Sequence, residues 1–183
     1  MINGQPECVP VSQATCWARG YLHYHTFDGW AYDFHGTCNY TVAKTCRDDS
    51  VLPSFHVTAK NENRGNTQVF YIGSVTVQVD GVTITAARAE VGFVWVNNTR
   101  AHLPVSLQIY QSGTSLILCT NFNLRVYYDW DNHWDNNKVT VLNDFSDSLC
   151  SNYNGDPSDN FRTPDGGLCS QCHRPGEKLG SGR

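Results

Sequence analysis

The sequence predicts an all-β fold, either an antiparallel sandwich or a barrel. The chain is rich in Val, Thr, Tyr, Trp, Asn and Gly and modest in Ala, Leu, Glu and Lys, the residues that helices favour. No segment keeps a helical apolar period for more than two turns, whereas short alternating segments recur between turn residues. Short strands at regular spacing are typical of sandwiches and barrels.

The clearest element is a β-hairpin within residues 69–86. In "SVTVQVDGVTITA", Val75, Val77 and Val79 alternate with polar residues, and a second alternating segment follows Asp80-Gly81. Both central residues of a type I′ turn need positive φ, which Asp and Gly tolerate. The pattern therefore predicts two strands joined by this turn.

Further strands are predicted after the hairpin, separated by polar turn segments. They cover Gly92 to Val96, Val105 to Tyr110, Ser115 to Thr120, Leu124 to Tyr128 and Val139 to Leu142. The aromatic residues of the last turn region form either an exposed patch or part of the core of a hairpin. They are Tyr127, Tyr128, Trp130 and Trp134.

Composition and charge limit the cellular compartments and the binding partners that the chain can have. The net charge is −4 with dispersed acidic residues, which argues against nucleic acid as a partner, and no apolar run approaches the roughly 20 residues that span a bilayer. Eight cysteines in 183 residues indicate an oxidising, secreted setting, and Asn39 and Asn97 begin N-glycosylation motifs. Because "MINGQPEC" lacks the pattern of a signal peptide, we expect either a fragment of a longer secreted protein or a gene model that lacks its first exons.

A loop near the C-terminal end offers oxygen ligands for a hard cation. "CSNYNGDPSDNF", residues 150–161, brings amides and carboxylates close together on a turning segment, the donor chemistry that Ca²⁺ prefers. Its Gly is misplaced for an EF-hand, and Thr163 stands where that motif needs Glu. The alternative is a solvated Asn/Asp turn.

A second candidate metal site lies near the N-terminal end. His23 and His25 share one face of a strand and, with His35, could bind zinc, with Asp28 or Asp33 as a general base. The alternative is a set of surface histidines. No nucleophile elbow or phosphate-binding loop appears in the sequence.

Two motifs together resemble the von Willebrand factor type D domain of gel-forming mucins, zonadhesin, tectorins and the IgG Fc-binding protein. The first is "CWARGYLHYHTFDGWAYDFHGTCNYTVAKTC", and the second, about a hundred residues later, is "LCSNYNGDPSDNFRTPDG". The resemblance implies a β-sandwich-like domain over residues 16–165. Residues 1–15 would end a preceding cysteine-rich module, and residues 166–183 would form a flexible cysteine-containing tail.

The resemblance also implies a structural Ca²⁺ that joins the two motifs. Asp28 of "TFDG" would bind the ion from the first motif. From the second motif come side chains of Asn152, Asn154, Asp159 and Asn160 and the main-chain carbonyl of Asp156.

The family implies only part of the disulfide pattern. Cys16 would pair with Cys150, and Cys38 with Cys169 or Cys172. Cys46 lacks its usual partner because Asp147 stands at that position, so we predict that Cys46 pairs with Cys119.

One departure from the family concerns self-cleavage. Several members carry Gly-Asp-Pro-His before "TFDG" and cleave themselves at the Asp-Pro bond, but this chain has Gly20-Tyr21-Leu22-His23. Without the Asp and the Pro, we expect no self-cleavage.

The sequence therefore predicts a non-enzymatic, calcium-stabilised extracellular module of a multidomain secreted glycoprotein. Its expected role is adhesion or the assembly of matrix or mucus, with other extracellular glycoproteins or matrix components as partners and further modules flanking it. The alternative is a secreted zinc-dependent hydrolase that uses His23, His25 and Asp28.

Overall fold

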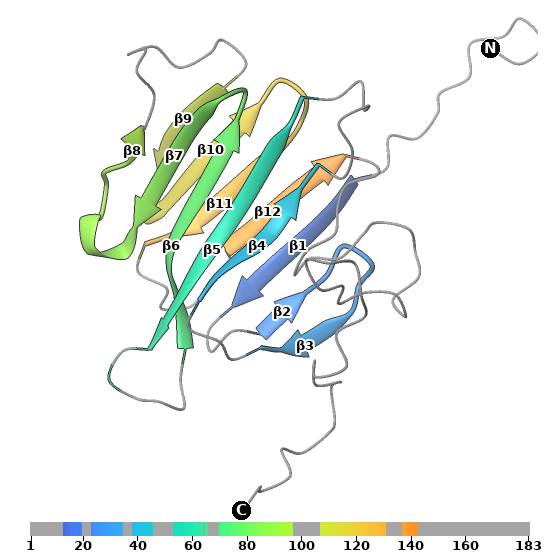
Figure 1. Cartoon of the computed structure of the whole chain (residues 1–183), viewed down its shortest axis with the longest axis vertical. Coiled ribbons are helices and arrows are strands. Elements are labelled where there is room, and N and C mark those ends of the chain that lie inside the picture. Colours follow the sequence, from blue (N-terminus) through green and yellow to red (C-terminus); the bar gives the residue numbers. More distant parts are fainter. Residues whose placement is uncertain are drawn as a thin grey trace, which may run out of the picture.

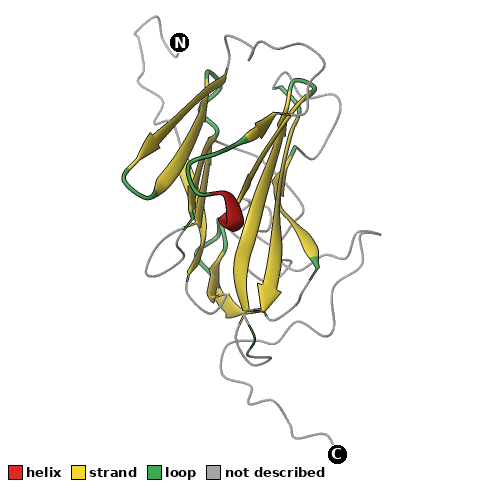
Figure 2. Ribbon diagram, turned by 90° about the vertical axis from the view of Figure 1, so that its left-hand side faces the viewer, coloured by secondary structure: helices red, strands yellow, loops and turns green. Residues whose placement is uncertain are grey.

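The computed structural model consists of two antiparallel β-sheets packed as two layers (Figures 1 and 2). It describes residues 13–19, 23–34, 38–45, 53–63, 65, 70–96, 107–130 and 137–142. One sheet has seven strands in the order β3-β2-β1-β12-β11-β10-β9, and the other has five in the order β4-β5-β6-β7-β8. The all-β prediction is confirmed.

The strands of the seven-stranded sheet are β1 (Gln13–Arg19), β2 (His23–His25), β3 (Ala31–Asp33), β9 (Leu107–Ser112), β10 (Ser115–Thr120), β11 (Arg125–Asp129) and β12 (Asn137–Leu142). Those of the five-stranded sheet are β4 (Asn39–Lys44), β5 (Phe55–Asn63), β6 (Phe70–Val79), β7 (Val82–Ala87) and β8 (Trp95–Val96). A single 3₁₀ turn, η1 (Arg88–Glu90), is the one helical element of the described residues.

The core lies between the two sheets because each strand turns alternate side chains inward. In β7, Val82, Ile84 and Ala86 are buried while the residues between them are half-buried. In β10, Leu116 and Leu118 join the core from the opposite sheet. Burying each such Val, Leu or Ile side chain contributes roughly 1.5–3 kcal/mol.

The predicted hairpin is confirmed as β6 and β7. Val79 pairs with Val82, which leaves Asp80 and Gly81 as a two-residue loop. Their φ angles are 50° and 75°, the positive values that a type I′ turn requires at both positions.

The predicted strand from Gly92 to Val96 is shorter than expected. Gly92 has a φ of 83° and lies in a turn, so pairing with β7 is limited to Trp95 and Val96. Conversely, the prediction did not include β5, although Phe55, Val57 and Ala59 alternate inward along it.

Two aromatic side chains left open by the sequence belong to the core. Tyr128 and Trp130 are 0% and 1% exposed, whereas Tyr127 alternates to the outer face and is half-buried. The Tyr128 hydroxyl donates a 3.0 Å hydrogen bond to the Gly73 carbonyl of β6 and so links the two sheets. The core alternative is therefore confirmed for Tyr128 and Trp130, while Trp134 lies outside the described residues.

Candidate functional site

A tight turn between β2 and β3 presents Asp28 at its tip. The Thr26 amide donates to the Trp30 carbonyl at 2.8 Å, and the Gly29 amide donates to the Thr26 carbonyl at 3.1 Å. The buried Thr26 hydroxyl accepts from the Trp30 amide at 3.0 Å. With Gly29 at a φ of 80°, which other residues adopt only with strain, the backbone holds Asp28 in a fixed place.

The strand before this turn is anchored across the sandwich by Tyr24. Its ring is 1% exposed, stacks on Tyr32 with centroids 5.5 Å apart, and meets Phe34 edge to face. The Tyr24 hydroxyl donates to Asn61 Oδ1 of β5 at 3.3 Å. Burial raises the pKa of Tyr24 far above its ordinary value, so the phenol stays neutral and can donate this bond throughout the physiological range.

Buried polar groups gather around this end of the sandwich. Asn61 is 1% exposed, and its backbone N–H donates to the Cys38 carbonyl at 3.1 Å. In the described part of the chain, three buried nitrogens here have no hydrogen-bond partner: Asn61 Nδ2, His25 Nδ1 and Trp30 Nε1. A fourth such nitrogen, Trp130 Nε1, follows β11, so three of the four unsatisfied buried nitrogens lie at this end, where each one costs stability.

The predicted calcium ligands can be followed only at Asp28. Its carboxylate is half-exposed on the fixed turn and supplies the hard, anionic oxygen that Ca²⁺ prefers, so it fits the predicted role. Asn152, Asn154, Asp156, Asp159 and Asn160 lie outside the described residues. The ligand set therefore stays a prediction.

The histidines of the zinc alternative have other neighbours. His23 Nδ1 lies 2.5 Å from Asp33 Oδ1 on β3, and the His25 ring stacks on Trp17 with centroids 5.0 Å apart. His35 is not among the described residues. Within those residues, no three His, Cys, Asp or Glu side chains lie close enough to hold a metal ion.

The cysteines are in different states. Cys16 of β1 is 2% exposed and disulfide-bonded, and its partner is neither Cys38 nor Cys119, which are free. Cys150, the partner that the family implies for Cys16, lies outside the described residues, as do Cys169 and Cys172, the partners considered for Cys38. The pairing of Cys16 with Cys150 stays a prediction, whereas the predicted pairing of Cys38 gains no support, because its thiol is free in the structure.

The proposed pairing of Cys46 with Cys119 gains no support from the structure. Cys119 alternates with the inward Leu118 and therefore faces outward on the seven-stranded sheet, where its sulfur lies 4.0 Å from the Tyr110 hydroxyl. Cys46 follows β4 of the opposite sheet by two positions in the sequence and is itself not described.

Of the two glycosylated positions predicted, the structure describes one, Asn39. Asn39 is exposed at the start of β4, where an attached glycan would have room, and the hydroxyl of Thr41 in the same motif lies 2.9 Å from His56 Nε2. Asn97 is outside the described part.

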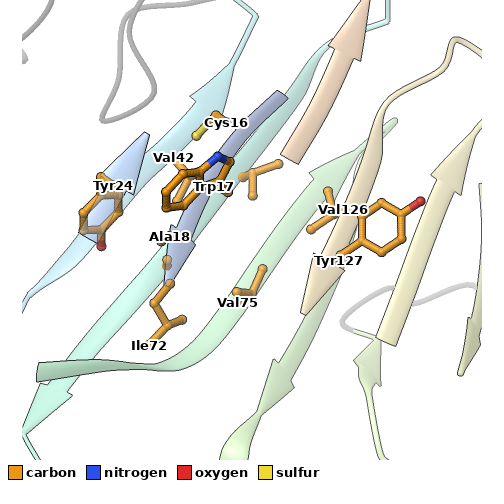
Figure 3. A pocket seen from close by; sticks show the side chains of 11 residues that line it. Cys16, Trp17, Ala18, Tyr24, Val42, Ile72, Val75, Val126 and Tyr127 are labelled. Atoms are coloured by element: carbon orange, nitrogen blue, oxygen red, sulfur yellow. The ribbon is translucent and has the colours of Figure 1, made fainter. Parts of the chain in front are cut away.

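A small cavity between the sheets does not resemble a substrate site (Figure 3). Its lining is almost wholly apolar and includes Ala18, Val42, Ile72, Val75 and Val126. Its volume of about 20 Å³ is close to that of one water molecule.

Comparison with protein families finds one family model that covers both sequence motifs and the described strands between them. The model of the von Willebrand factor type D domain matches residues 16–167, from the disulfide-bonded cysteine of β1 past the predicted calcium loop. The chain belongs to the von Willebrand factor type D domain family. This confirms the resemblance of the two sequence motifs and agrees with the expectation of a non-enzymatic domain.

Several curated proteins resemble this von Willebrand factor type D domain over most of its length. Human IgGFc-binding protein is 46% identical over 173 residues, covering 92% of this chain and 3% of that protein. Mouse alpha-tectorin is 40% identical over 167 residues, covering 87% and 8%, and pig zonadhesin is 36% identical over 172 residues, covering 89% and 7%. The chain thus spans less than a tenth of each relative. Within the described residues, no helix has the length and hydrophobicity needed to cross a bilayer.

Proposed function

We propose that this von Willebrand factor type D domain is a calcium-stabilised, non-enzymatic module of a longer secreted glycoprotein that acts in adhesion or in matrix or mucus assembly. The observation that carries the calcium proposal is the turn from Thr26 to Trp30. Three hydrogen bonds fix its backbone and leave a carboxylate, Asp28, at the tip. A rigid anionic oxygen is a good starting point for a calcium site because little ordering entropy is lost on binding.

The remaining proposed ligands would come from the second motif. Asn152, Asn154, Asp156, Asp159 and Asn160 offer amide, carbonyl and carboxylate oxygens, and the carboxylates of Asp28 and Asp159 would balance the charge of the ion. The ion would close a loop of more than a hundred residues between the two motifs. It would stabilise the fold by restricting the unfolded chain and by binding only the folded state.

The need for such a link agrees with the unsatisfied groups around β2. Asn61, His25 and Trp30 each bury a nitrogen that has no partner within the described residues. Strands β2 and β3 have only three residues each, so their own ladder bonds are few. A cation bound at the adjoining turn would supply stabilisation that local pairing does not.

The role in adhesion or assembly rests on the relatives. They include alpha-tectorin, zonadhesin and a protein named for binding IgG Fc, and each is more than ten times longer than the matched segment. Partners would be other extracellular glycoproteins or matrix components, reached alongside flanking modules of the same chain. Secretion is supported by the eight cysteines and by the disulfide at Cys16.

Thermal melting of the full chain tests the calcium proposal. At a calcium concentration about 100 times the Kd, binding contributes about 2.7 kcal/mol, which corresponds to a Tm increase of roughly 5–10 °C for a domain of this size. We expect chelation to remove this increase, calcium to restore it, and zinc to be ineffective. An unchanged Tm after chelation and calcium return would contradict the proposal, and a Tm increase with zinc alone would favour the hydrolase alternative.

A further inference from the structure

The outer face of the seven-stranded sheet differs in charge from the chain as a whole. The chain has a net charge of −4, yet Arg19 of β1 and Arg125 of β11 are exposed, and neither forms an ion pair within the described residues. Both face outward, because the residues beside them, Ala18 and Val126, are buried in the core. This face therefore carries positive charge that the described residues do not neutralise.

The acidic residues on the strands of this sheet do not offset that charge. They are two in number within the described residues: Asp33, which lies 2.5 Å from His23 Nδ1 on the edge pair β2–β3, and Asp129, which is 8% exposed. By contrast, Arg88 of η1, which follows β7 of the other sheet, pairs with Glu62 at 3.7 Å. An anionic partner would meet little opposing charge on the outer face of the seven-stranded sheet.

Trp17 holds the guanidinium of Arg19 in place. The guanidinium carbon lies 4.2 Å from the centroid of the Trp17 ring, and the His25 ring stacks on the same indole with centroids 5.0 Å apart. The cation–π contact limits the rotamers of Arg19. A guanidinium that is ordered before binding loses less entropy when its N–H groups receive an oxyanion.

A row of side chains connects this stack with the far edge of the sheet. The strand pairings place five residues in register across β1, β12, β11, β10 and β9 (Figure 1): Trp17, Lys138, Tyr127, Ile117 and Tyr110. Tyr110 is 49% exposed, and Tyr127 is half-buried on the outer side. A tyrosine ring offers an apolar surface to the C–H groups of a sugar, and its hydroxyl can donate a hydrogen bond.

The two arginines are too far apart for one small anion. Thr15 of β1 and Arg125 of β11 both pair with Thr140 of β12, so Arg125 lies two strands away from β1, and Arg19 lies four residues beyond Thr15. A strand spacing of about 4.8 Å and a rise of about 3.4 Å per residue put the Cα atoms of the two arginines roughly 17 Å apart. A ligand that contacts both must be an extended chain with repeated negative charges.

We propose that the basic face, meaning Arg19, Trp17, Tyr127, Arg125 and Tyr110, binds a sulfated polysaccharide that lies across the strands from β1 to β9. The arginines would bind sulfate oxygens, and sugar rings would lie against the tyrosines. The inference names a partner for the proposed role in adhesion or assembly, and it rests on that proposal only for the extracellular setting. It does not require calcium, because none of these residues belongs to the Asp28 turn.

Nucleic acid, another extended polyanion, fits this face less well. Proteins that bind single strands stack the bases on free aromatic faces. The indole of Trp17 is instead occupied by Arg19 and His25. The disulfide of Cys16 also indicates an oxidising, extracellular setting.

Surface plasmon resonance of the full chain over immobilised heparin tests the proposal. We expect binding that weakens as the salt concentration rises, because added ions screen exposed charges. Arg19→Ala and Arg125→Ala should each raise the dissociation constant about fivefold, and the double variant about 25-fold, since the two sites are far enough apart to act independently. Trp17→Leu keeps both charges and should raise it about two- to threefold by freeing the Arg19 side chain.

The matched control is Arg88→Ala, which removes the same charge from an arginine that is already paired with Glu62. We expect it to change the dissociation constant by less than about twofold. Heparin stripped of its sulfates should bind about tenfold more weakly or worse, because the charge-assisted hydrogen bonds are lost. No heparin binding by the wild-type chain, equal effects of Arg88→Ala and Arg19→Ala, or competition by a single-stranded oligonucleotide as strong as by soluble heparin would overturn the proposal.

Removal of calcium separates this proposal from the calcium proposal. Below the Tm of the chelated chain, heparin binding should persist in chelator, whereas the calcium proposal is read from the Tm itself. Heparin binding that disappears on chelation, with an unchanged circular dichroism spectrum, would show that the ion and not the basic face holds the polysaccharide. A Tm that does not respond to calcium, together with normal heparin binding, would contradict the calcium proposal alone.

Discussion

The β6–β7 hairpin and the Asp28 end, meaning β2, β3 and the turn between them, are held together in different ways. In the hairpin, strands adjacent in sequence pair over six positions, and Val77, Val79, Val82 and Ile84 are at most 3% exposed. In the Asp28 end, the strands are three residues long, and Tyr24 reaches 37 positions along the sequence to Asn61. Apolar burial and local pairing stabilise the hairpin, whereas the Asp28 end is held by a polar link to a residue distant in the sequence.

The difference shows which part of this sandwich domain needs stabilisation beyond strand pairing and apolar burial. Of the four buried side-chain nitrogens without partners in the described part, those of Asn61, His25 and Trp30 lie around the Asp28 end, the fourth belongs to Trp130 after β11, and none lies in the hairpin. The disulfide of Cys16 and the proposed calcium ion would act on this weaker end. The packing of the hairpin should not depend on the disulfide or on the calcium ion.

The largest expected effect comes from removing the disulfide at Cys16. Cys16→Ala should lower the free energy of unfolding by about 3–5 kcal/mol, because the unfolded chain loses a cross-link. Denaturant unfolding of the purified chain measures this change. The matched control is Cys38→Ala at an exposed free thiol, for which we expect less than about 0.5 kcal/mol. Equal changes in the two variants would show that the Asp28 end does not depend on the cross-link.

A core substitution in the hairpin should have the next largest effect. Ile84→Ala leaves a cavity at a 1% exposed site and should lower the free energy of unfolding by about 3 kcal/mol. The cost should be the same with calcium and with chelator, since the hairpin is stabilised by apolar burial. Thr83→Ala, at the neighbouring half-buried position, serves as control and should cost under about 1 kcal/mol. If the loss of unfolding free energy in Ile84→Ala changed with calcium, the two regions would not be stabilised in different ways.

The smallest expected effect is at the polar link of the hairpin to the opposite sheet. Tyr128→Phe removes the donor to the Gly73 carbonyl and leaves that buried acceptor unsatisfied, at a cost of about 1–2 kcal/mol. Tyr127→Phe, at the adjacent outward residue, should change the unfolding free energy by less than about 0.5 kcal/mol. Chemical denaturation of both variants would distinguish a single polar link from general loss of tyrosine hydroxyls.

The same contrast explains what could be predicted from sequence. The hairpin was predictable because its signal is local: alternating Val residues around Asp80-Gly81, whose positive φ angles the structure confirms. Strands β2 and β3 are too short to show periodicity, and β5 was missed although Phe55, Val57 and Ala59 alternate. The length of β8 was wrong because Gly92 turns the chain before pairing begins.

Asp28 was singled out through the family motif "TFDG" and not through contacts. The structure places it at the tip of a turn that the sequence analysis did not predict, and its role as a calcium ligand stays a prediction. The hydrogen bond from Tyr24 to Asn61 had no sequence signal, because nothing local indicates which buried polar groups meet across two sheets. The pairing of Cys46 with Cys119 was inferred by matching leftover cysteines, without knowledge of which face Cys119 occupies.

The most direct test of the account compares two acid-to-amide variants in calcium and in chelator. Asp28→Asn removes the anionic oxygen at the tip of the fixed turn, and Asp33→Asn makes the same change at an exposed residue of β3. We expect the calcium-dependent Tm increase to disappear in Asp28→Asn and to persist in Asp33→Asn, with the two Tm values similar in chelator. A calcium-dependent increase of full size in Asp28→Asn would contradict the proposal that calcium stabilises the domain through this turn.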